Sequence, residues 1–439
     1  MEIDSERDFA VRRWSDLLDL DGFLLFPAIV LILLSLMLLK SAEGGIYFTK
    51  QFSLLFPAFI ISSLFLFIRI RFLESISHWF YILSIIMLLA VLFIGSSSLG
   101  AQRWINLGFI KIQPSEFSKL AIIIAFSGWL KSHPVKNYFD LFISGLIILL
   151  PFLLIFKQPD LGTALTFIAI FSGMTFWSGA KITQILAVLS PLLSLVFNAV
   201  GPVIYTFGDI LFKGKIIEIT ATYCFIFFIL SVTMWFVIYY KGWKSPLKVF
   251  FISLFISINF IIGCMRPVLW NLLQPYQQKR LTIFLNPESD PLGSGYHIIQ
   301  SILAIGNGGL FGYGWLNGRL TKGSYVPAQH TDFIFSICGE EFGFIGSVIV
   351  LILFCVILWR ILHIAVNSNN QFASLIAIGI FSYFSFHVFI NIGMAVGIMP
   401  ITGVPLLLLS YGGTSLFVTL FSIFILLSIS WRTLSRKMF

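Results

Sequence analysis

The chain has 439 residues, of which 58% are hydrophobic and only 11% are charged, and its mean hydropathy is +0.97. A soluble domain carries about 25% charged residues, so this sequence has too few polar residues to cover a water-soluble multidomain enzyme. Its apolar residues occur in long runs rather than in alternation, which excludes a transmembrane β-barrel. The net charge of +9 lies mostly between those runs, and no nucleic-acid-binding module is present. The sequence therefore predicts an all-α protein that crosses a membrane several times.

Residues 1–21 hold seven acids and three arginines and have no apolar core. This composition is typical of a soluble tail rather than a cleaved signal peptide. We therefore expect the first apolar run to remain in the protein as a membrane anchor.

Twelve apolar runs then approach the roughly 20 residues that a spanning helix needs. They lie near residues 22–40, 52–70, 79–95, 114–131, 141–156, 161–179, 182–205, 219–240, 248–264, 334–359, 373–398 and 404–430. Between 265 and 333 the chain is rich in Gly, Pro and polar residues and has only weak helical periodicity.

The basic residues predict the orientation of these spans. Loops on the side of the N-terminus hold 15 Lys and Arg, and the short loops on the other side hold 7. Because basic residues favour cytoplasmic loops, we expect a cytoplasmic tail at 1–21, one transmembrane domain at 22–430 and a second cytoplasmic tail at 431–439. The segment 265–333 is then a large extracellular loop.

A first polar patch interrupts this pattern at Arg103 and Trp104 and continues from Gln113 to Lys119. Glu116 and Lys119 are three residues apart, so on a helix they share a face. Two interpretations stay open. The pair is an internal ion pair, or Arg103 and Lys119 converge on a phosphate as an anion site.

A second patch, at Gln158 and Asp160, repeats the same Gln-Pro-x-acid helix start. Asp160 in a first turn would be stabilised by the helix dipole, so capping competes with a functional role. In the long loop, Glu288 and Asp290 suit a general base or metal ligands, or merely a turn. His330 and Asp332 suggest either structural hydrogen bonds or, with His297, a metal site.

Taken in order over residues 95–415, these patches resemble the SEDS family, the shape, elongation, division and sporulation proteins. The matching stretches are Arg103–Trp104 with Gln113–Lys119, Gln158–Thr163, Asn286–His297, His330–Phe335 with Glu340–Glu341, Asn391–Met394 through Gly403–Pro405, and Ser410–Gly413. Within the family, the stretch from Pro287 to Gly293 is more similar to the elongation members than to the division members. One departure is Ala328, which follows Pro327 where family members commonly have glutamate.

The resemblance implies a peptidoglycan glycosyltransferase that polymerises lipid II, with inversion, at the outer face of the bacterial cytoplasmic membrane. It implies ten transmembrane helices, to which residues 200–264 would add an inserted helix pair, and a catalytic loop at 265–333. The family's essential aspartate matches Asp290, which would act as the base. The remaining matched residues would bind substrate: Arg103, Trp104, Glu116, Lys119, Gln158, Asp160, Glu288, His330, Asp332 and Ser410.

The resemblance also implies a partner, a class B penicillin-binding transpeptidase, whose membrane helix we expect to pack near 334–398. No cofactor is firmly implied, and a divalent cation, Mg²⁺ or Mn²⁺, is left open. Three alternatives stay open as well: a lipid II flippase, a division-type polymerase and a non-enzymatic scaffold.

Overall fold

A computed structural model of the chain describes residues 21–98, 101–106, 111–158, 160–190 and 293–435, together with short stretches at 254, 257–259, 261, 278–280, 283–284 and 287–290. Most of the two predicted tails and of the predicted helix pair at 200–264 lies outside the described residues. The same holds for the second half of the predicted span at 182–205.

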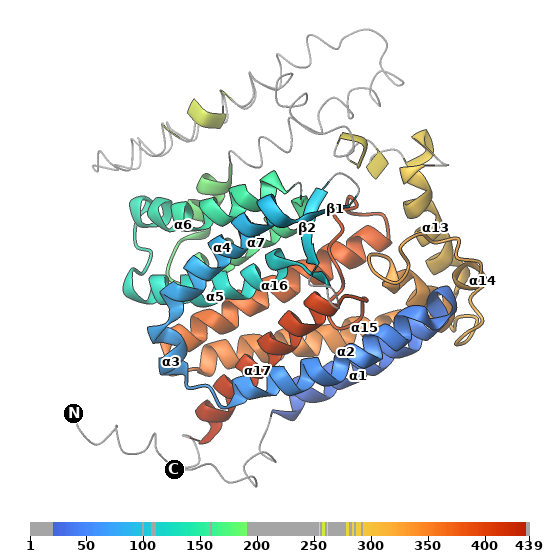
Figure 1. The fold of residues 1–439 in the computed structure, drawn as a ribbon, viewed down its shortest axis with the longest axis horizontal. Coiled ribbons are helices and arrows are strands. Elements are labelled where there is room, and N and C mark those ends of the chain that lie inside the picture. Colours follow the sequence, from blue (N-terminus) through green and yellow to red (C-terminus); the bar gives the residue numbers. More distant parts are fainter. Residues whose placement is uncertain are drawn as a thin grey trace.

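Helices make up nearly all of the described structure (Figure 1). The α-helices are α1 (Gly22–Ser41), α2 (Ile46–Ser63), α3 (Ile70–Ser75), α4 (Ser77–Ile94), α5 (Pro114–Ser132), α6 (Tyr138–Lys157), α7 (Leu161–Trp177), α13 (Ser294–Asn307), α14 (Arg319–Lys322), α15 (Ile334–Asn367), α16 (Gln371–Ala395) and α17 (Gly413–Ser435). Short 3₁₀ turns are η3 (Ala42–Gly45), η4 (Leu64–Leu66) and η5 (Pro287–Ser289).

Within the described residues, seven helical segments are long and apolar enough to cross a membrane: α1, α2 with η4, α4, α6, α15, α16 and α17. Helix α5 runs beside them over 19 residues, but it carries Glu116, Lys119 and Lys131. The all-α polytopic prediction is confirmed. Even the shortest predicted span, 141–156, forms the 20-residue helix α6.

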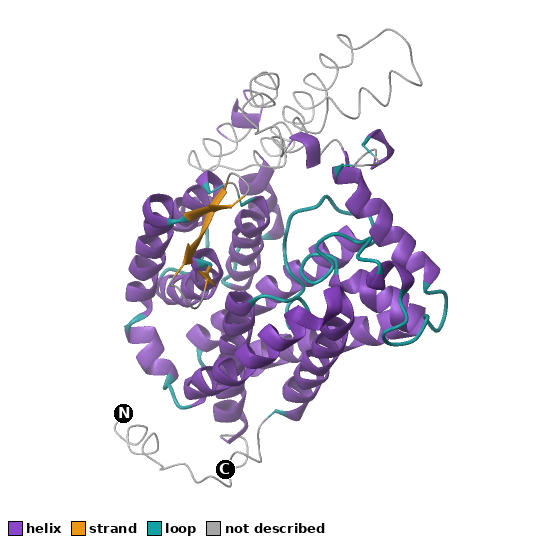
Figure 2. Ribbon diagram, turned by 45° about the vertical axis from the view of Figure 1, so that its right-hand side comes forward, coloured by secondary structure: helices purple, strands orange, loops and turns teal. Residues whose placement is uncertain are grey.

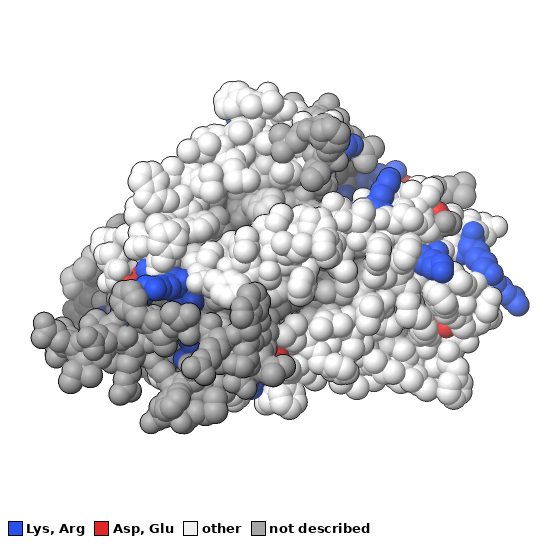
Figure 3. Space-filling view, turned by 60° about the horizontal axis from the view of Figure 1, so that its bottom comes forward, with Lys and Arg blue, Asp and Glu red and all other residues white. Residues whose placement is uncertain are grey.

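Successive long helices run in opposite directions between two ends of the bundle. At one end, Asp21 receives an ion pair from Arg360 Nε at 2.6 Å and a hydrogen bond from Ser430 Oγ at 2.8 Å. We call this the basal end. At the other end, Ser41 Oγ donates to Glu341, and the segments 96–98, 101–106, 111–113, 287–290, 308–333 and 396–412 gather there. We call it the site end. Figure 3 shows Lys and Arg gathered toward the two ends, with an almost uncharged face between them.

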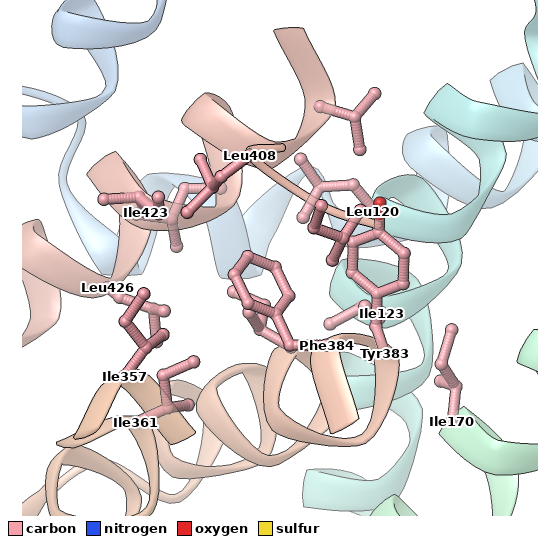
Figure 4. Packing of buried hydrophobic residues seen from close by; sticks show 14 of the residues in the cluster. Leu120, Ile123, Ile170, Ile357, Ile361, Tyr383, Phe384, Leu408, Ile423 and Leu426 are labelled. Atoms are coloured by element: carbon pink, nitrogen blue, oxygen red, sulfur yellow. The ribbon is translucent and has the colours of Figure 1, made fainter. Parts of the chain in front are cut away.

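Helices α16 and α17 form the centre of the bundle, because 78% and 83% of their apolar windows are buried, against 39% or less for the other candidate spans. The outer helices present apolar side chains outward, as lipid contact requires. Figure 4 shows the interior, where Tyr383 and Phe384 of α16 lie among side chains of α5, α15 and α17.

A small antiparallel sheet covers part of the site end (Figure 2). Its strands are β1 (Ser96–Ser98), β2 (Ala101–Asn106) and β3 (Lys111–Ile112), in the order β1-β2-β3. In the register, Trp104 lies opposite Ser96, and Ile105 lies opposite Ile112. This ribbon leads the chain from α4 into α5.

The predicted span at 404–430 is wrong over its first nine residues. Helix α17 begins only at Gly413, and the preceding segment is a buried, non-helical loop. Leu408 has a φ of 66°, and Ser410 Oγ accepts a hydrogen bond from the backbone N–H of Leu406 at 2.8 Å. Apolar composition alone does not distinguish such a loop from helix, because Leu406–Leu409 are as buried as core helix residues.

Candidate functional site

Two chain segments that are distant in sequence are bonded together at the site end. Asn391 of α16 donates through Nδ2 to the carbonyl oxygens of Asp332, at 2.9 Å, and of Val404, at 2.8 Å. Ser410 Oγ donates to the carbonyl oxygen of Thr331 at 2.6 Å. The His-Thr-Asp stretch and the loop before α17 therefore form one unit. Ser410 acts in it through backbone contacts.

The first two polar patches meet at the starts of α5 and α7. Arg103 Nε on β2 donates to the carbonyl oxygen of Gln158 at 3.3 Å. Gln113 Nε2 donates to Asp160 Oδ2 at 3.3 Å, while Asp160 Oδ1 accepts from the backbone N–H of Thr163 at 3.3 Å. The capping interpretation of Asp160 is thus confirmed. Its second oxygen still joins the two patches.

Asp332 lies in the electrostatic field of both patches. The pKa of Asp332 is raised to about 6, mainly by burial; Arg280 and Arg103 oppose this rise, and the Asp160 carboxylate adds to it. We call Arg103, Asp160, Arg280 and Asp332 the arginine–aspartate cluster. Its guanidinium groups can bind an anion, and its carboxyl groups can accept hydrogen bonds from sugar hydroxyls.

Asp290 directly follows η5. Its Oδ2 is 2.7 Å from Lys279 Nζ, and its side chain is 30% exposed. The next residue, Arg280, is the one whose charge acts on Asp332. One turn, 278–280, therefore connects Asp290 to the arginine–aspartate cluster. A Cβ at Gly293 would collide with the Asp290 carboxylate, so a side chain there would displace that carboxylate.

Glu288 and Trp104 also belong to the predicted site. Glu288 is exposed in η5, and Trp104 is half-buried on β2, next to Arg103. Both positions face the site end, where the arginine–aspartate cluster lies.

The predicted pair Glu116 and Lys119 is an internal ion pair. Lys119 Nζ lies 2.7 Å from Glu116 Oε1 and 3.2 Å from His387 Nε2, and the Lys119 side chain is fully buried. His387 Nδ1 in turn lies 2.9 Å from the carbonyl oxygen of Pro405, in the loop before α17. A direct contact of Lys119 with substrate would require this pair to open, so that role stays a prediction.

His330 is held by residues of the first two helices. Its Nδ1 is 3.0 Å from Glu43 Oε1, and its ring stacks on Tyr47 with centroids 3.7 Å apart. Burial lowers the pKa of His330, and the Glu43 carboxylate partly offsets that effect. The hydrogen-bonded interpretation of His330 thus holds. Among the described residues, no three His, Cys, Asp or Glu come together as metal ligands.

Sequence reasoning missed four of these residues: Glu43, Tyr47, Lys279 and His387. One signal was available for His387. Tyr383, His387 and Asn391 are spaced four apart, so on a helix they form a polar stripe. Nothing local marks Glu43 or Tyr47, because their partners are almost 300 residues away.

The bundle and its polar end define a multi-pass α-helical membrane protein with a candidate site built from loops and helix starts. The cell cycle protein family of FtsW, RodA and SpoVE matches residues 16–211 and 225–434. The chain belongs to this family, which confirms the resemblance seen in its motifs.

Named relatives agree with this assignment. The chain is 41% identical over 348 residues to the peptidoglycan glycosyltransferase RodA of Treponema pallidum, covering 76% of this chain and 78% of the relative. It is 33% identical to the peptidoglycan glycosyltransferase MrdB of Escherichia coli K12, covering 82% and 79%. It is also 33% identical to the probable peptidoglycan glycosyltransferase FtsW of Buchnera aphidicola from Acyrthosiphon pisum, covering 90% and 82%.

Solved structures share the fold. A chain of a peptidoglycan synthase complex that coordinates polymerization and crosslinking aligns with a TM-score of 0.68 and 26% identity, covering 94% of this chain and 98% of that one. RodA of Thermus thermophilus aligns with a TM-score of 0.59 and 23% identity, covering 94% and 96%.

Proposed function

We propose that this chain is a RodA-type peptidoglycan glycosyltransferase that polymerises lipid II into glycan strands during cell elongation. Support comes from two relatives that are named peptidoglycan glycosyltransferases. They are 41% and 33% identical to this chain over at least three quarters of its length. The observation in the structure that carries the proposal is Asp290. It is a partly exposed carboxylate that pairs with Lys279, the residue next to Arg280 of the arginine–aspartate cluster.

In the proposed reaction, the Asp290 carboxylate takes the proton of the acceptor sugar's 4-hydroxyl. The oxygen attacks the anomeric carbon of the donor, a new glycosidic bond forms with inversion, and the bond to undecaprenyl pyrophosphate breaks. The leaving group departs with its electron pair as an anion. Arg103 and Arg280 would stabilise that charge. Lys279 must release Asp290 for the base to reach the hydroxyl, and the Lys279 side chain is 52% exposed.

The remaining predicted ligands have distinct roles in this proposal. Asp160, Asp332 and Gln158 would orient sugar hydroxyls, with Trp104, Glu288 and His330 at the margin of the site. Glu116, Lys119 and Ser410 would not contact substrate directly. They would position the loop before α17. Their contacts to His387 and to the carbonyl oxygen of Thr331 support this arrangement.

We place the site end outside the bacterial cytoplasmic membrane and both termini in the cytoplasm. The excess of basic residues in the loops of the basal end supports this orientation. A class B penicillin-binding transpeptidase is the proposed partner. The surface of helix α15 supports this partner. It exposes the apolar side chains of Phe344, Ile349, Ile352 and Trp359, against which a second membrane helix could pack.

The test is polymerisation of lipid II by the purified full-length chain, with and without Mg²⁺ or Mn²⁺. Asp290→Ala should abolish glycan strands while thermal unfolding stays as in the wild type. Glu74→Ala is the matched control, because Glu74 is also a carboxylate paired with a lysine, and its side chain is 29% exposed. Full polymerisation by Asp290→Ala would refute the assigned base. If the chain, reconstituted in vesicles, flips lipid II but does not polymerise it, the flippase alternative is favoured.

A division-type polymerase is the second candidate, because the FtsW relative matches 90% of the chain. Depletion strains separate the two functions. The chain should restore rod shape when the resident elongation polymerase is depleted. Rescue of septation alone would favour division, and growth rescue by Asp290→Ala would favour a scaffold.

A further inference from the structure

A cavity of about 430 Å³ lies at the site end, outside the proposed catalytic site. It opens between the end of α1, the start of α2 and the segment around α14. Its lining consists of Lys40, Ser41, Gly45, Phe48, Leu316 and Lys322. The lining residues thus combine two lysines with two large apolar side chains.

The two lysines of this cavity have no carboxylate partner among the described residues. Lys40 and Lys322 are both exposed, and neither forms an ion pair there. The ammonium of Lys40 lies 5.4 Å from the ring centroid of Trp315, a cation–π contact that keeps its charge.

Three carboxylates occur on the neighbouring elements, and each has its own partner. Glu43 pairs with His330 at 3.0 Å, and Glu341 accepts from the Ser41 hydroxyl. Glu340 accepts three hydrogen bonds from residues 320 and 321, at 2.6–2.9 Å. The cavity therefore presents two lysine ammonium groups that pair with none of the described carboxylates.

The depth of the cavity matches that of lipid headgroups. Helix α1 is a 20-residue apolar span that ends at Ser41, so the cavity begins where the hydrocarbon layer ends. Trp315 is 38% exposed and donates from Nε1 to the carbonyl oxygen of Met37 at 3.0 Å. Aromatic side chains at this level are typical of the membrane interface. Figure 3 shows basic side chains gathered at the end of the molecule that holds α1's last turn and α14 in Figure 1.

Below the cavity, α1 offers an apolar track to an acyl chain. Ile29, Leu33 and Met37 are spaced four residues apart, so they lie along one face of the helix, and Lys40 continues that face. Ile29 and Leu33 are 48% and 55% exposed. A soluble phosphate would use only the lysines, whereas a phospholipid would use the lysines and the track.

We propose that this cavity binds the phosphate headgroup of an anionic phospholipid, with Lys40 and Lys322 on the phosphate and the acyl chain along α1. The site is separate from the lipid-linked substrate site. The cavity adjoins η3, and Glu43 of η3 pairs with His330. A lipid bound in the cavity would therefore stabilise the contact between Glu43 and His330.

The test titrates the purified full chain, in uncharged detergent, with dioleoyl phosphatidylglycerol or phosphatidylcholine and follows thermal unfolding and Trp fluorescence. Phosphatidylglycerol should bind more tightly and raise the melting temperature more. Lys40→Ala with Lys322→Ala should weaken its binding about thirtyfold, because one basic residue near an anionic lipid contributes about a factor of five. The control Lys136→Ala with Lys181→Ala changes two exposed basal lysines and should bind as the wild type.

A conservative variant guards against misfolding. Lys40→Arg with Lys322→Arg should keep tight binding, which a purely steric site would not require. Equal binding of the two lipids would overturn the proposal, as would wild-type binding by the double alanine variant. Displacement of phosphatidylglycerol by inorganic phosphate at the same concentration would make this a free-phosphate site. Displacement by undecaprenyl pyrophosphate would make it part of the substrate site. Either result refutes the proposal.

Discussion

Lys119→Met removes a fully buried charge from the polar core of the described structure. The Lys119 side chain is fully buried, with Nζ 2.7 Å from Glu116 Oε1 and 4.8 Å from the Tyr383 ring centroid. Breaking such a pair costs about 3–5 kcal/mol, because it leaves an uncompensated charge in a dry interior. Among the described residues, the second oxygen of Glu116, Oε2, has no hydrogen-bond partner. We therefore expect the single variant to lose about 3–5 kcal/mol of unfolding free energy.

The assay is denaturant unfolding of the detergent-solubilised chain, run as a double-mutant cycle. Glu116→Gln together with Lys119→Met removes both charges, so this double variant should lose about 2 kcal/mol or less. The two single losses would then exceed the double loss. Additive losses, or a loss below about 1 kcal/mol for Lys119→Met, would refute the buried-pair reasoning. A stable Lys119→Met variant with weakened lipid II binding would instead identify Lys119 as a substrate ligand.

Three further predictions concern the site end. Gly308→Ala should destabilise by about 1–3 kcal/mol, because its Cβ would collide with a backbone oxygen of α15. A Cβ at Gly306 would meet no atom of the described residues within 4 Å. Gly306→Ala should therefore be neutral or gain up to about 1 kcal/mol, and equal thermal unfolding of the two variants would contradict this. The pKa of Asp332, about 6 when folded and ordinarily 3.8, predicts that stability falls as pH rises from about 4 to 6 and then levels. Asp332→Asn should remove that fall and gain on the order of 1–3 kcal/mol at pH 7, and an unchanged pH slope in urea unfolding would count against it. Glu43→Gln should lower the pKa of His330 further, since it removes the charge that raises it. NMR titration of the histidine checks this, and a rise or no change would be the wrong outcome.

Much of the membrane architecture was predictable because spanning helices are encoded locally. A helix in lipid satisfies its backbone within its own segment, so a run of about 20 apolar residues is a sufficient signal. The bounds of α1, α4 and α7 differ from the predicted runs by only one or two residues. The segment before Gly413 is an apolar run that is not helical. Hydrogen bonds with the side chains of Ser410 and Asn391 satisfy its backbone groups in place of helical bonds.

The candidate site was predictable only as a list of motifs. Asp160 and Asp290 stand out because a carboxylate is rare in a chain with 11% charged residues. Whether such a residue reaches an open site or a sealed core depends on packing. Lys119 and Arg103 were equally conspicuous, yet one is fully buried against Glu116 and the other is half-buried on β2.

By itself, the sequence determined the class of protein, most of the described spans, the motifs of the family and the scarcity of charge, because each depends on residues that are neighbours in the chain. Only the tertiary structure decided that Glu43 meets His330 and that Lys40 and Lys322 line one cavity. These pairs are separated by nearly 300 residues. They meet because α1 ends against the start of α15, and no local pattern encodes which helices pack together.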